Sequence, residues 1–348
     1  MVYASLSNRR DQYAMTDLRA LLQQRRVLLA DGATGTAYFD IGLTAGDPPE
    51  LWNIDHPDRV RALHQGFVDA GSDIILTNTF GANRDRLKLH KLQDRSFELN
   101  SHGAEIARRV ADAAGRPVVV AGSVGPLGEL FEPLGALTGK TATDAFTVQA
   151  EGLKAGGADI CWIETMSAVE ELRAAAQGAI NAGMPYIATA SFDTAGKTMM
   201  GLDPADLAPI FDDLAEPPVA IGANCGVGAA DLLVSLLTMS DAAPDRIFIA
   251  KANAGVPKIH GEHIHYSGTP ELMANYACLA ANVGARIIGG CCGTSLKHLA
   301  AMRAALDAFE PGPRPDRAAI EAATGPLVNP VRDRAAPPRR ERRRRRRT

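Results

Sequence analysis

Eight short apolar runs, rich in valine and isoleucine, recur along this 348-residue chain at intervals of roughly thirty to fifty residues. The runs occupy residues 27–30, 73–77, 117–122, 159–164, 186–191, 219–224, 247–253 and 286–290. Segments with a helical apolar period lie between them, at residues 58–71, 143–157, 167–183, 228–240, 269–284 and 295–309. Strands that alternate with helices predict βα units and a parallel sheet. Eight such units favour an α/β fold, the closed (β/α)8 TIM barrel, over an open doubly wound sheet.

The two ends of the chain differ in composition from its middle. The first residues lack the apolar core of a secretory signal, and no apolar run approaches the length of a membrane span. We therefore expect a cytoplasmic protein without membrane contact. From about residue 311 the chain is rich in proline, arginine and alanine and has no apolar period. The predicted organisation is a flexible N-terminus over 1–16, one barrel over 17–310 and a disordered basic tail over 311–348.

The net charge of −3 is unevenly distributed along the chain. Residues 339–348 contain eight arginines and one glutamate, a charge of +7, so the rest of the chain carries −10. An acidic body does not offer the basic face of a nucleic-acid-binding fold. We expect the arginine run to be a solvated tail, and we expect no specific nucleic-acid partner.

The carboxyl ends of the predicted strands carry an unusual set of side chains. In a (β/α)8 barrel the catalytic groups lie where strands end and loops begin. The polar and thiol side chains at these ends are Asp31, Asn78, Glu164, Asn224, Cys225, Cys291 and Cys292. Three of the five cysteines thus fall at one rim. Cys161 lies within a strand and Cys278 within a helical segment, where packing in the core is the expected role.

The three rim cysteines predict a metal site. An odd number of cysteines without an export signal argues against a disulfide framework. A catalytic zinc ion typically has three protein ligands and one open position. Cys225, Cys291 and Cys292 fit that pattern, and Gly290 and Gly293 permit the sharp turn that adjacent ligands need. For the Cys291–Cys292 pair alone, a vicinal disulfide or two ordinary buried thiols are the alternatives; with Cys225 nearby, Zn²⁺ is the predicted cofactor.

The ligand set also indicates the reaction. Three thiolates give Zn²⁺ a formal site charge of −1, which makes it a weak activator of water. A fourth, substrate thiolate would stay deprotonated and nucleophilic there. The prediction is therefore thiol alkylation rather than hydrolysis. A zinc-thiolate hydrolase or lyase and a non-catalytic binder are the alternatives from other classes, although a hydrolase would be expected to group histidines or carboxylates at the metal.

Four motifs resemble the zinc-dependent homocysteine S-methyltransferase family. That family includes betaine–homocysteine methyltransferase and the homocysteine domain of cobalamin-dependent methionine synthase. The motifs are DGATGT (31–36), TNTFGAN (77–83), GANCG (222–226) and GGCCGT (289–294). The similarity spans roughly residues 25–310. It implies a barrel enzyme that transfers a methyl group to zinc-bound homocysteine and makes methionine.

The resemblance implies roles for individual side chains. Cys225, Cys291 and Cys292 match the residues that bind zinc in the family and activate the substrate thiol. Asp31 and Glu164 match the carboxylates that lie near the homocysteine amino group. Two carboxylates suit an ammonium group, because charge-assisted hydrogen bonds are strong.

The resemblance also bears on the surrounding loops. The backbone of residues 32–34, from Gly32 to Thr34, lies where the substrate carboxylate would find N–H donors. Asn78 and Asn224 either shape the pocket or brace the loops. With both ends of homocysteine held, we expect the methyl carbon to approach the sulfur in line with its leaving group.

The methyl donor is less constrained than the acceptor. A small onium donor such as betaine would be held by aromatic faces, and Trp52, Phe80, Phe131 and Phe192 lie near the predicted rim. Betaine enzymes carry a tyrosine after the TNTF phenylalanine, where this chain has Gly81. A separate corrinoid protein that docks at the rim, as in a split cobalamin-dependent methionine synthase, is the alternative donor. The favoured partners are homocysteine and a small onium donor, with betaine first.

Overall fold

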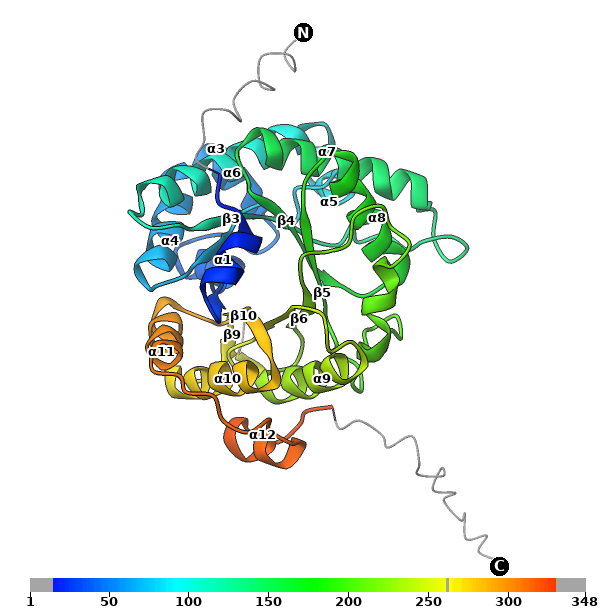
Figure 1. The fold of residues 1–348 in the computed structure, drawn as a ribbon. Coiled ribbons are helices and arrows are strands. Elements are labelled where there is room, and N and C mark those ends of the chain that lie inside the picture. Colours follow the sequence, from blue (N-terminus) through cyan, green and yellow to red (C-terminus); the bar gives the residue numbers. More distant parts are fainter. Residues whose placement is uncertain (1–14, 261–262, 330–348) are drawn as a thin grey trace, which may run out of the picture.

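Residues 15–260 and 263–329 are described by a computed structural model, in which eight parallel strands form a barrel (Figure 1). The order of strands around it is β1-β10-β7-β6-β5-β4-β3-β2, so successive strands of the barrel are neighbours. The strands are β1 (Leu28–Leu29), β2 (Ile74–Leu76), β3 (Val119–Val124), β4 (Ile160–Met166), β5 (Tyr186–Ala190), β6 (Ile221–Cys225), β7 (Phe248–Ala252) and β10 (Ala285–Gly290).

The barrel closes between its first two strands. Ala30 pairs with Ile74 in a parallel bridge, and the Asp73 N–H donates to the Leu29 carbonyl oxygen over 2.6 Å. Closure pairs the edges of the sheet and fixes which strand ends are adjacent. Each predicted apolar run overlaps one of the eight strands, so the predicted (β/α)8 barrel is confirmed.

The larger α-helices pack around the outside of the barrel (Figure 1). They are α4 (Pro57–Asp69), α6 (Ser96–Ala113), α7 (Gly139–Ala155), α8 (Val169–Asn181), α9 (Ala229–Ala242), α10 (Pro270–Val283) and α11 (Leu296–Asp307). All except α6 coincide with predicted segments. The buried side of α6 mixes apolar residues such as Leu99 and Val110 with small and polar residues such as Asn100 and Gly103. In the part of the chain that the structure describes, no helix is both long and apolar enough to cross a bilayer.

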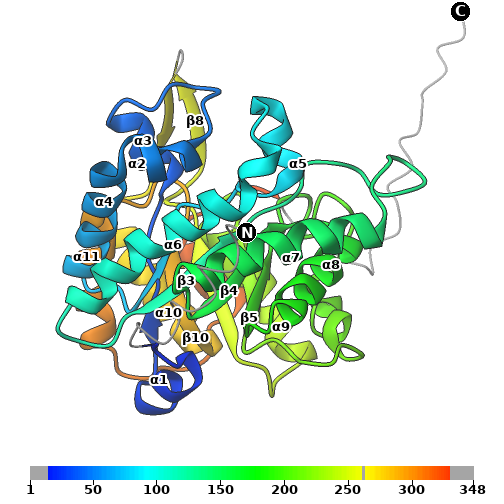
Figure 2. The same cartoon turned by 90° about the horizontal axis from the view of Figure 1, so that it is seen from above.

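Short elements lie at the two ends of the barrel (Figure 2). Helix α1 (Leu18–Gln24) covers one end, and the antiparallel hairpin of β8 (Pro257–His260) and β9 (His263–Tyr266) projects at the other. The remaining short helices are α2 (Gly35–Asp40), η3 (Pro49–Leu51), α3 (Trp52–Asp55), α5 (Arg84–Leu87), η4 (Lys88–His90), η5 (Gln93–Arg95), η6 (Pro204–Asp206) and η7 (Ala208–Phe211). The last two replace the α-helix expected between β5 and β6, where prolines remove backbone N–H donors.

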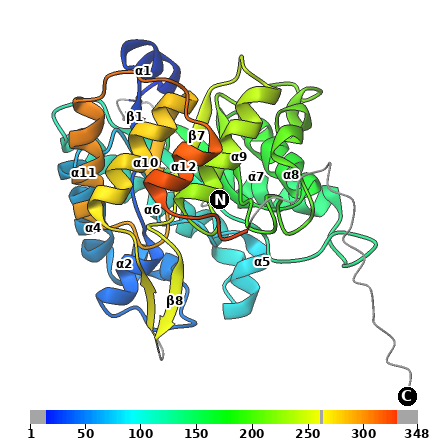
Figure 3. The same cartoon turned by 90° about the horizontal axis from the view of Figure 1, so that it is seen from below.

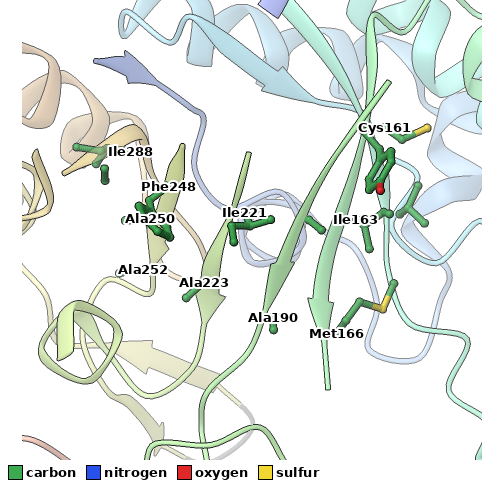
Figure 4. Packing of buried hydrophobic residues seen from close by; sticks show 14 of the residues in the cluster. Cys161, Ile163, Met166, Ala190, Ile221, Ala223, Phe248, Ala250, Ala252 and Ile288 are labelled. Carbon is green, nitrogen blue, oxygen red and sulfur yellow. The ribbon is translucent and has the colours of Figure 1, made fainter. Parts of the chain in front are cut away.

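Two apolar cores lie on opposite faces of the sheet. Inside the barrel, side chains such as Trp162 and Ile249 pack in one cluster with Leu21 of α1. The outer face packs against the helices, and Figure 4 shows part of this layer around Cys161. The Cys161 sulfur lies 3.7 Å from the Met184 sulfur and is buried, so its predicted core role is confirmed.

The chain beyond the barrel differs from prediction. Residues 311–329, whose composition predicts disorder, run along the barrel surface, and α12 (Arg317–Thr324) packs against α9 and α10 (Figure 3). Ile320 is fully buried, and Arg314 pairs with Asp241 over 2.6 Å. One buried isoleucine and a few polar contacts anchor a segment without producing an apolar period. The arginine run and residues 1–14 of the predicted flexible N-terminus lie outside the described residues.

We predict that His64 makes the stability of the protein depend on pH. Its side chain is buried on α4, neither ring nitrogen has a hydrogen-bond partner among the described residues, and burial lowers its pKa from 6.5 to about 4. Between about pH 6.5 and pH 4, His64 is therefore protonated in the unfolded chain but not in the folded protein. This difference lowers the free energy of unfolding by up to about 3 kcal/mol as the pH falls to 4.

His64→Leu should remove this part of the pH dependence. Urea unfolding near neutral pH and near pH 5 measures the change in free energy of unfolding for both proteins. The wild-type protein should lose more stability than the variant over this interval. Equal losses would show that His64 is not the responsible group.

Candidate metal centre and substrate site

Strand register brings three thiols to one corner of the rim. Ala252 of β7 pairs with Cys225 of β6 on one side and with Gly290 of β10 on the other. Cys225 and the Cys291–Cys292 pair therefore flank β7 at one level, and their sulfur atoms all lie within 4.8 Å of one another. Two strand spacings, about 10 Å, separate β6 from β10. The structure thus places together the three cysteines that the sequence singles out.

Left-handed backbone conformations shape both thiol-bearing loops. Cys225 has a φ of 62°, which costs about 1–2 kcal/mol for a residue with a side chain. Gly293 has a φ of 76°, and a Cβ atom there would lie 2.2 Å from the Tyr266 ring. The turn predicted at Gly293 is therefore present. Strained backbone such as that of Cys225 at the end of β6 is typical of functional sites.

Asn253, which directly follows β7, ties the two thiol-bearing loops together. Its side-chain amide donates to the Gly226 carbonyl oxygen over 2.7 Å, and its side-chain oxygen accepts the Cys292 N–H over 3.0 Å. The Cys291 N–H donates to the Ala252 carbonyl oxygen over 2.6 Å. Asn253 is buried, so water does not compete for these bonds. The residues after β7 therefore hold the thiols in place.

The three thiols suit a soft divalent metal. Interaction with the other two thiols lowers the pKa of Cys292 and raises that of Cys225. All three cysteines are partly exposed and unpaired in disulfides, so a metal and a fourth ligand have access. Zinc, with three thiolates and one open position, fits this donor set.

Asp31 and Glu164 are buried at the ends of their strands. One oxygen of Asp31 accepts the Leu76 N–H over 2.7 Å, and one oxygen of Glu164 accepts the Ser123 hydroxyl over 2.5 Å. Burial raises the pKa of Asp31 to about 6 and that of Glu164 to about 7, although the charge of Lys251 opposes both shifts. The charge of Asp31 also contributes to the raised pKa of Glu164.

A buried lysine on β7, Lys251, lies close to these carboxylates. Its ammonium nitrogen is 3.3 Å from one oxygen of Asp31 and donates to the Gly32 carbonyl oxygen over 3.4 Å. Burial by itself would lower the pKa of Lys251, but the charges of Asp31, Cys291 and Glu164 together raise it. Lys251 is therefore a charged residue inside the site.

Sequence reasoning selected neither Lys251 nor Asn253. Strand periodicity offered a signal, because successive side chains of a strand point to opposite faces. In the run 247–253, Ile249, Lys251 and Asn253 alternate with alanines and so share one face of the strand. Because Ile249 points into the barrel, the polar side chains of Lys251 and Asn253 are expected on the inner face near the rim. A lysine on the inner face of a barrel strand indicates a buried charge with partners.

The two predicted asparagines differ in their surroundings. The Asn78 side chain donates to the side-chain oxygen of Asn53 over 3.0 Å, which braces the loop after β2. The side-chain oxygen of Asn224 accepts the Thr165 N–H over 2.7 Å. The nitrogen of the Asn224 amide lies 3.9 Å from the Cys291 sulfur. Asn224 is therefore in contact with the thiol cluster, whereas Asn78 supports a neighbouring loop.

The loop after β1 is partly committed to internal hydrogen bonds. The Ala33 N–H donates to the Thr294 carbonyl oxygen over 3.0 Å. Thr34 is partly exposed and begins α2 without a side-chain cap. The binding of a substrate carboxylate by this loop is a proposal that rests on Gly32 and Thr34.

Replacing Asn253 by alanine should weaken zinc binding by about 10–100-fold, because residues that orient metal ligands typically contribute that much. Competition with a chromogenic chelator measures the affinity. Asn53→Ala is a matched control: Asn53 is also buried, and its side chain donates to the carbonyl oxygens of Asn78 and Leu99 instead of to the thiol loops. Equal losses in both variants, or none in Asn253→Ala, would contradict the assignment.

Comparisons with known proteins agree with this site. Residues 28–306 match the family model described as homocysteine S-methyltransferase. The chain is 33% identical over 318 residues to methionine synthase of Mycobacterium tuberculosis and 32% identical over 324 residues to that of Mycobacterium leprae. Each alignment covers 87% of this chain and 26% of the relative, so the chain spans about a quarter of the length of these curated relatives.

A solved structure supports the fold. The homocysteine methyltransferase MmuM of Escherichia coli, in its metallated form, has a TM-score of 0.68 and 24% identity to this chain. The superposition covers 82% of this chain and 99% of that one. Because the family model matches most of the described barrel, this chain belongs to the homocysteine S-methyltransferase family.

Proposed function

We propose that this protein transfers a methyl group to the sulfur of homocysteine and forms methionine. The observation that carries the proposal is the cluster of Cys225, Cys291 and Cys292, whose sulfurs lie within 4.8 Å of one another at the barrel rim. Zinc bound by these residues would supply the positive charge that keeps the substrate sulfur deprotonated and still nucleophilic. Within the described residues the cluster consists of thiols alone, whereas a zinc hydrolase would be expected to offer histidine or carboxylate ligands.

The charged residues near the thiols suit the amino-acid end of the substrate. Asp31 and Glu164 supply negative charge for the ammonium group, and the backbone at Gly32 and Thr34 offers N–H donors to the carboxylate. Holding the substrate at both ends aligns its sulfur with the methyl carbon and its leaving group. Such alignment is worth about 7–11 kcal/mol of the barrier for well-oriented reactants.

A small onium donor, with betaine first, is one candidate for the methyl source. The Tyr266 ring lies against Gly293 beside the thiols and could offer an aromatic face to such a cation. Two other candidate rings are occupied or covered. Trp52 is 7% exposed and has the Arg59 guanidinium 4.9 Å from its ring, and Phe192 is 4% exposed.

A corrinoid protein that docks at the rim is the second candidate donor, and the surface of the loops favours it. Large apolar side chains in the loops and short helices that follow the strands are 48–75% exposed. These are Phe39, Ile41, Leu89, Leu130, Leu134, Met199 and Met200. All of them belong to segments that follow the carboxyl ends of barrel strands, where a docking partner would reach the thiol cluster.

The function is tested by incubating the zinc-loaded protein with homocysteine and one donor at a time. The donors are betaine, S-methylmethionine, dimethylsulfoniopropionate and methylcobalamin, the last both free and bound to a corrinoid protein. We expect mass spectrometry to detect methionine with at least one of them. Formation only with the protein-bound corrinoid would identify a split methionine synthase, and formation with no donor would overturn the proposal.

Cys225→Ala or Cys291→Ala should abolish both zinc binding and methionine formation, because each removes one of three ligands. Cys278→Ala is the matched control, since Cys278 is a partly buried thiol on α10 outside the cluster. It should retain zinc and activity. A Cys291→Ala protein that lacks zinc and still forms methionine would show that the cluster is not the site of thiol activation.

A further inference from the structure

The interior of the barrel changes from apolar to charged toward its mouth. Ile249 packs with the apolar interior cluster, and Lys251, two residues further along β7, lies on the same face. The same change from an apolar to a charged side chain occurs in β4, where Glu164 lies two residues after Trp162. Lys251 is 3% exposed and sits within ion-pair distance of the strand-one carboxylate. A lysine is therefore built into the layer that faces the proposed substrate.

The contacts of Lys251 fix the corner after β1. Its ammonium nitrogen is 3.3 Å from one oxygen of Asp31 and 3.4 Å from the Gly32 carbonyl oxygen. The other oxygen of Asp31 accepts the Leu76 N–H over 2.7 Å. Asp31 is 0% exposed, and its oxygen that faces Lys251 has the ion pair but no hydrogen-bond partner among the described residues.

Glu164 has a different environment. It is 6% exposed, and one of its oxygens accepts the Ser123 hydroxyl. Lys251 interacts with it by charge only, whereas Lys251 contacts Asp31 directly. Among the described residues, Glu164 is therefore the carboxylate of the pair that has no ion-pair partner.

The charges of this layer do not balance without a further cation. When both carboxylates are ionised, Asp31 and Glu164 contribute two negative charges and Lys251 contributes one positive charge. One negative charge is left over, and a buried charge without a partner is unfavourable. The ammonium group of an amino-acid thiol supplies one positive charge.

We propose that Lys251 is a positioning residue that sets the selectivity of the site for thiols that carry an amino group. It neutralises Asp31 and fixes the Asp31–Gly32 corner, so that the charge of Glu164 is directed to the substrate ammonium. This inference rests on the proposed function, because it concerns how the same site distinguishes homocysteine from other thiols.

The test compares two ligands that differ only in the amino group, homocysteine and 4-mercaptobutanoate. Isothermal titration calorimetry with the zinc-loaded full-length protein measures both dissociation constants, and a separate assay measures zinc content. The wild-type protein should prefer homocysteine by about tenfold or more, equivalent to about 1.4 kcal/mol. Lys251→Met should lose most of this preference while binding 4-mercaptobutanoate about as well as the wild-type protein.

Two further variants separate this role from a general effect on folding. Lys154→Met removes a lysine whose ammonium donates to the Ala182 carbonyl oxygen away from the site, and it should keep the preference. The double variant Asp31→Asn/Lys251→Met removes both members of the ion pair and leaves Glu164 charged. This double variant should again prefer homocysteine over 4-mercaptobutanoate, and more clearly than the Lys251→Met single variant does.

Each outcome decides between the alternatives. The inference would be overturned if Lys251→Met retains zinc and the full preference for homocysteine. It would also be overturned if the variant binds both thiols more weakly by the same factor. If Lys251→Met loses zinc, the double variant provides the test instead. A zinc-loaded double variant that binds homocysteine and 4-mercaptobutanoate equally would overturn the inference. Wild-type protein that binds both thiols equally would overturn the inference but not the proposed function. Wild-type protein that binds neither thiol would overturn both.

Discussion

The parallel pairing of β7 with β6 and β10 is the constraint on which the site depends. Ala252 is in register with Cys225 and with Gly290, so the barrel holds both thiol-bearing strand ends at one level. The adjacent residue, Asn253, then bonds both loops through its side chain. The thiol cluster is therefore a product of sheet register, and the local turns only complete it.

The charged layer beside the thiols shows how a barrel core can carry polar chemistry. Ionised groups in a buried site are stable only when they are paired and hydrogen-bonded. Asp31 meets this condition through Lys251 and a strand amide, and Glu164 meets it in part through Ser123. The negative and positive charges of this layer nearly cancel, and the layer can accept one additional positive charge.

Family membership and fold constrain this protein to different degrees. The (β/α)8 barrel hosts many chemistries, and the residues at its rim decide which one is present. Here the chain belongs to the homocysteine S-methyltransferase family and carries a cluster of three thiols at its rim.

The sequence by itself determined the barrel, most of its helices and the thiol motif. Apolar runs, helical periods and adjacent cysteines are local signals, which survive without knowledge of contacts. Only the tertiary structure decided the contact of Lys251 with Asp31, the clamp by Asn253 and the docking of α12. These features join residues far apart in the chain, and their distances follow from strand register and barrel closure. Local patterns do not encode those long-range relations, because each depends on how the whole sheet pairs.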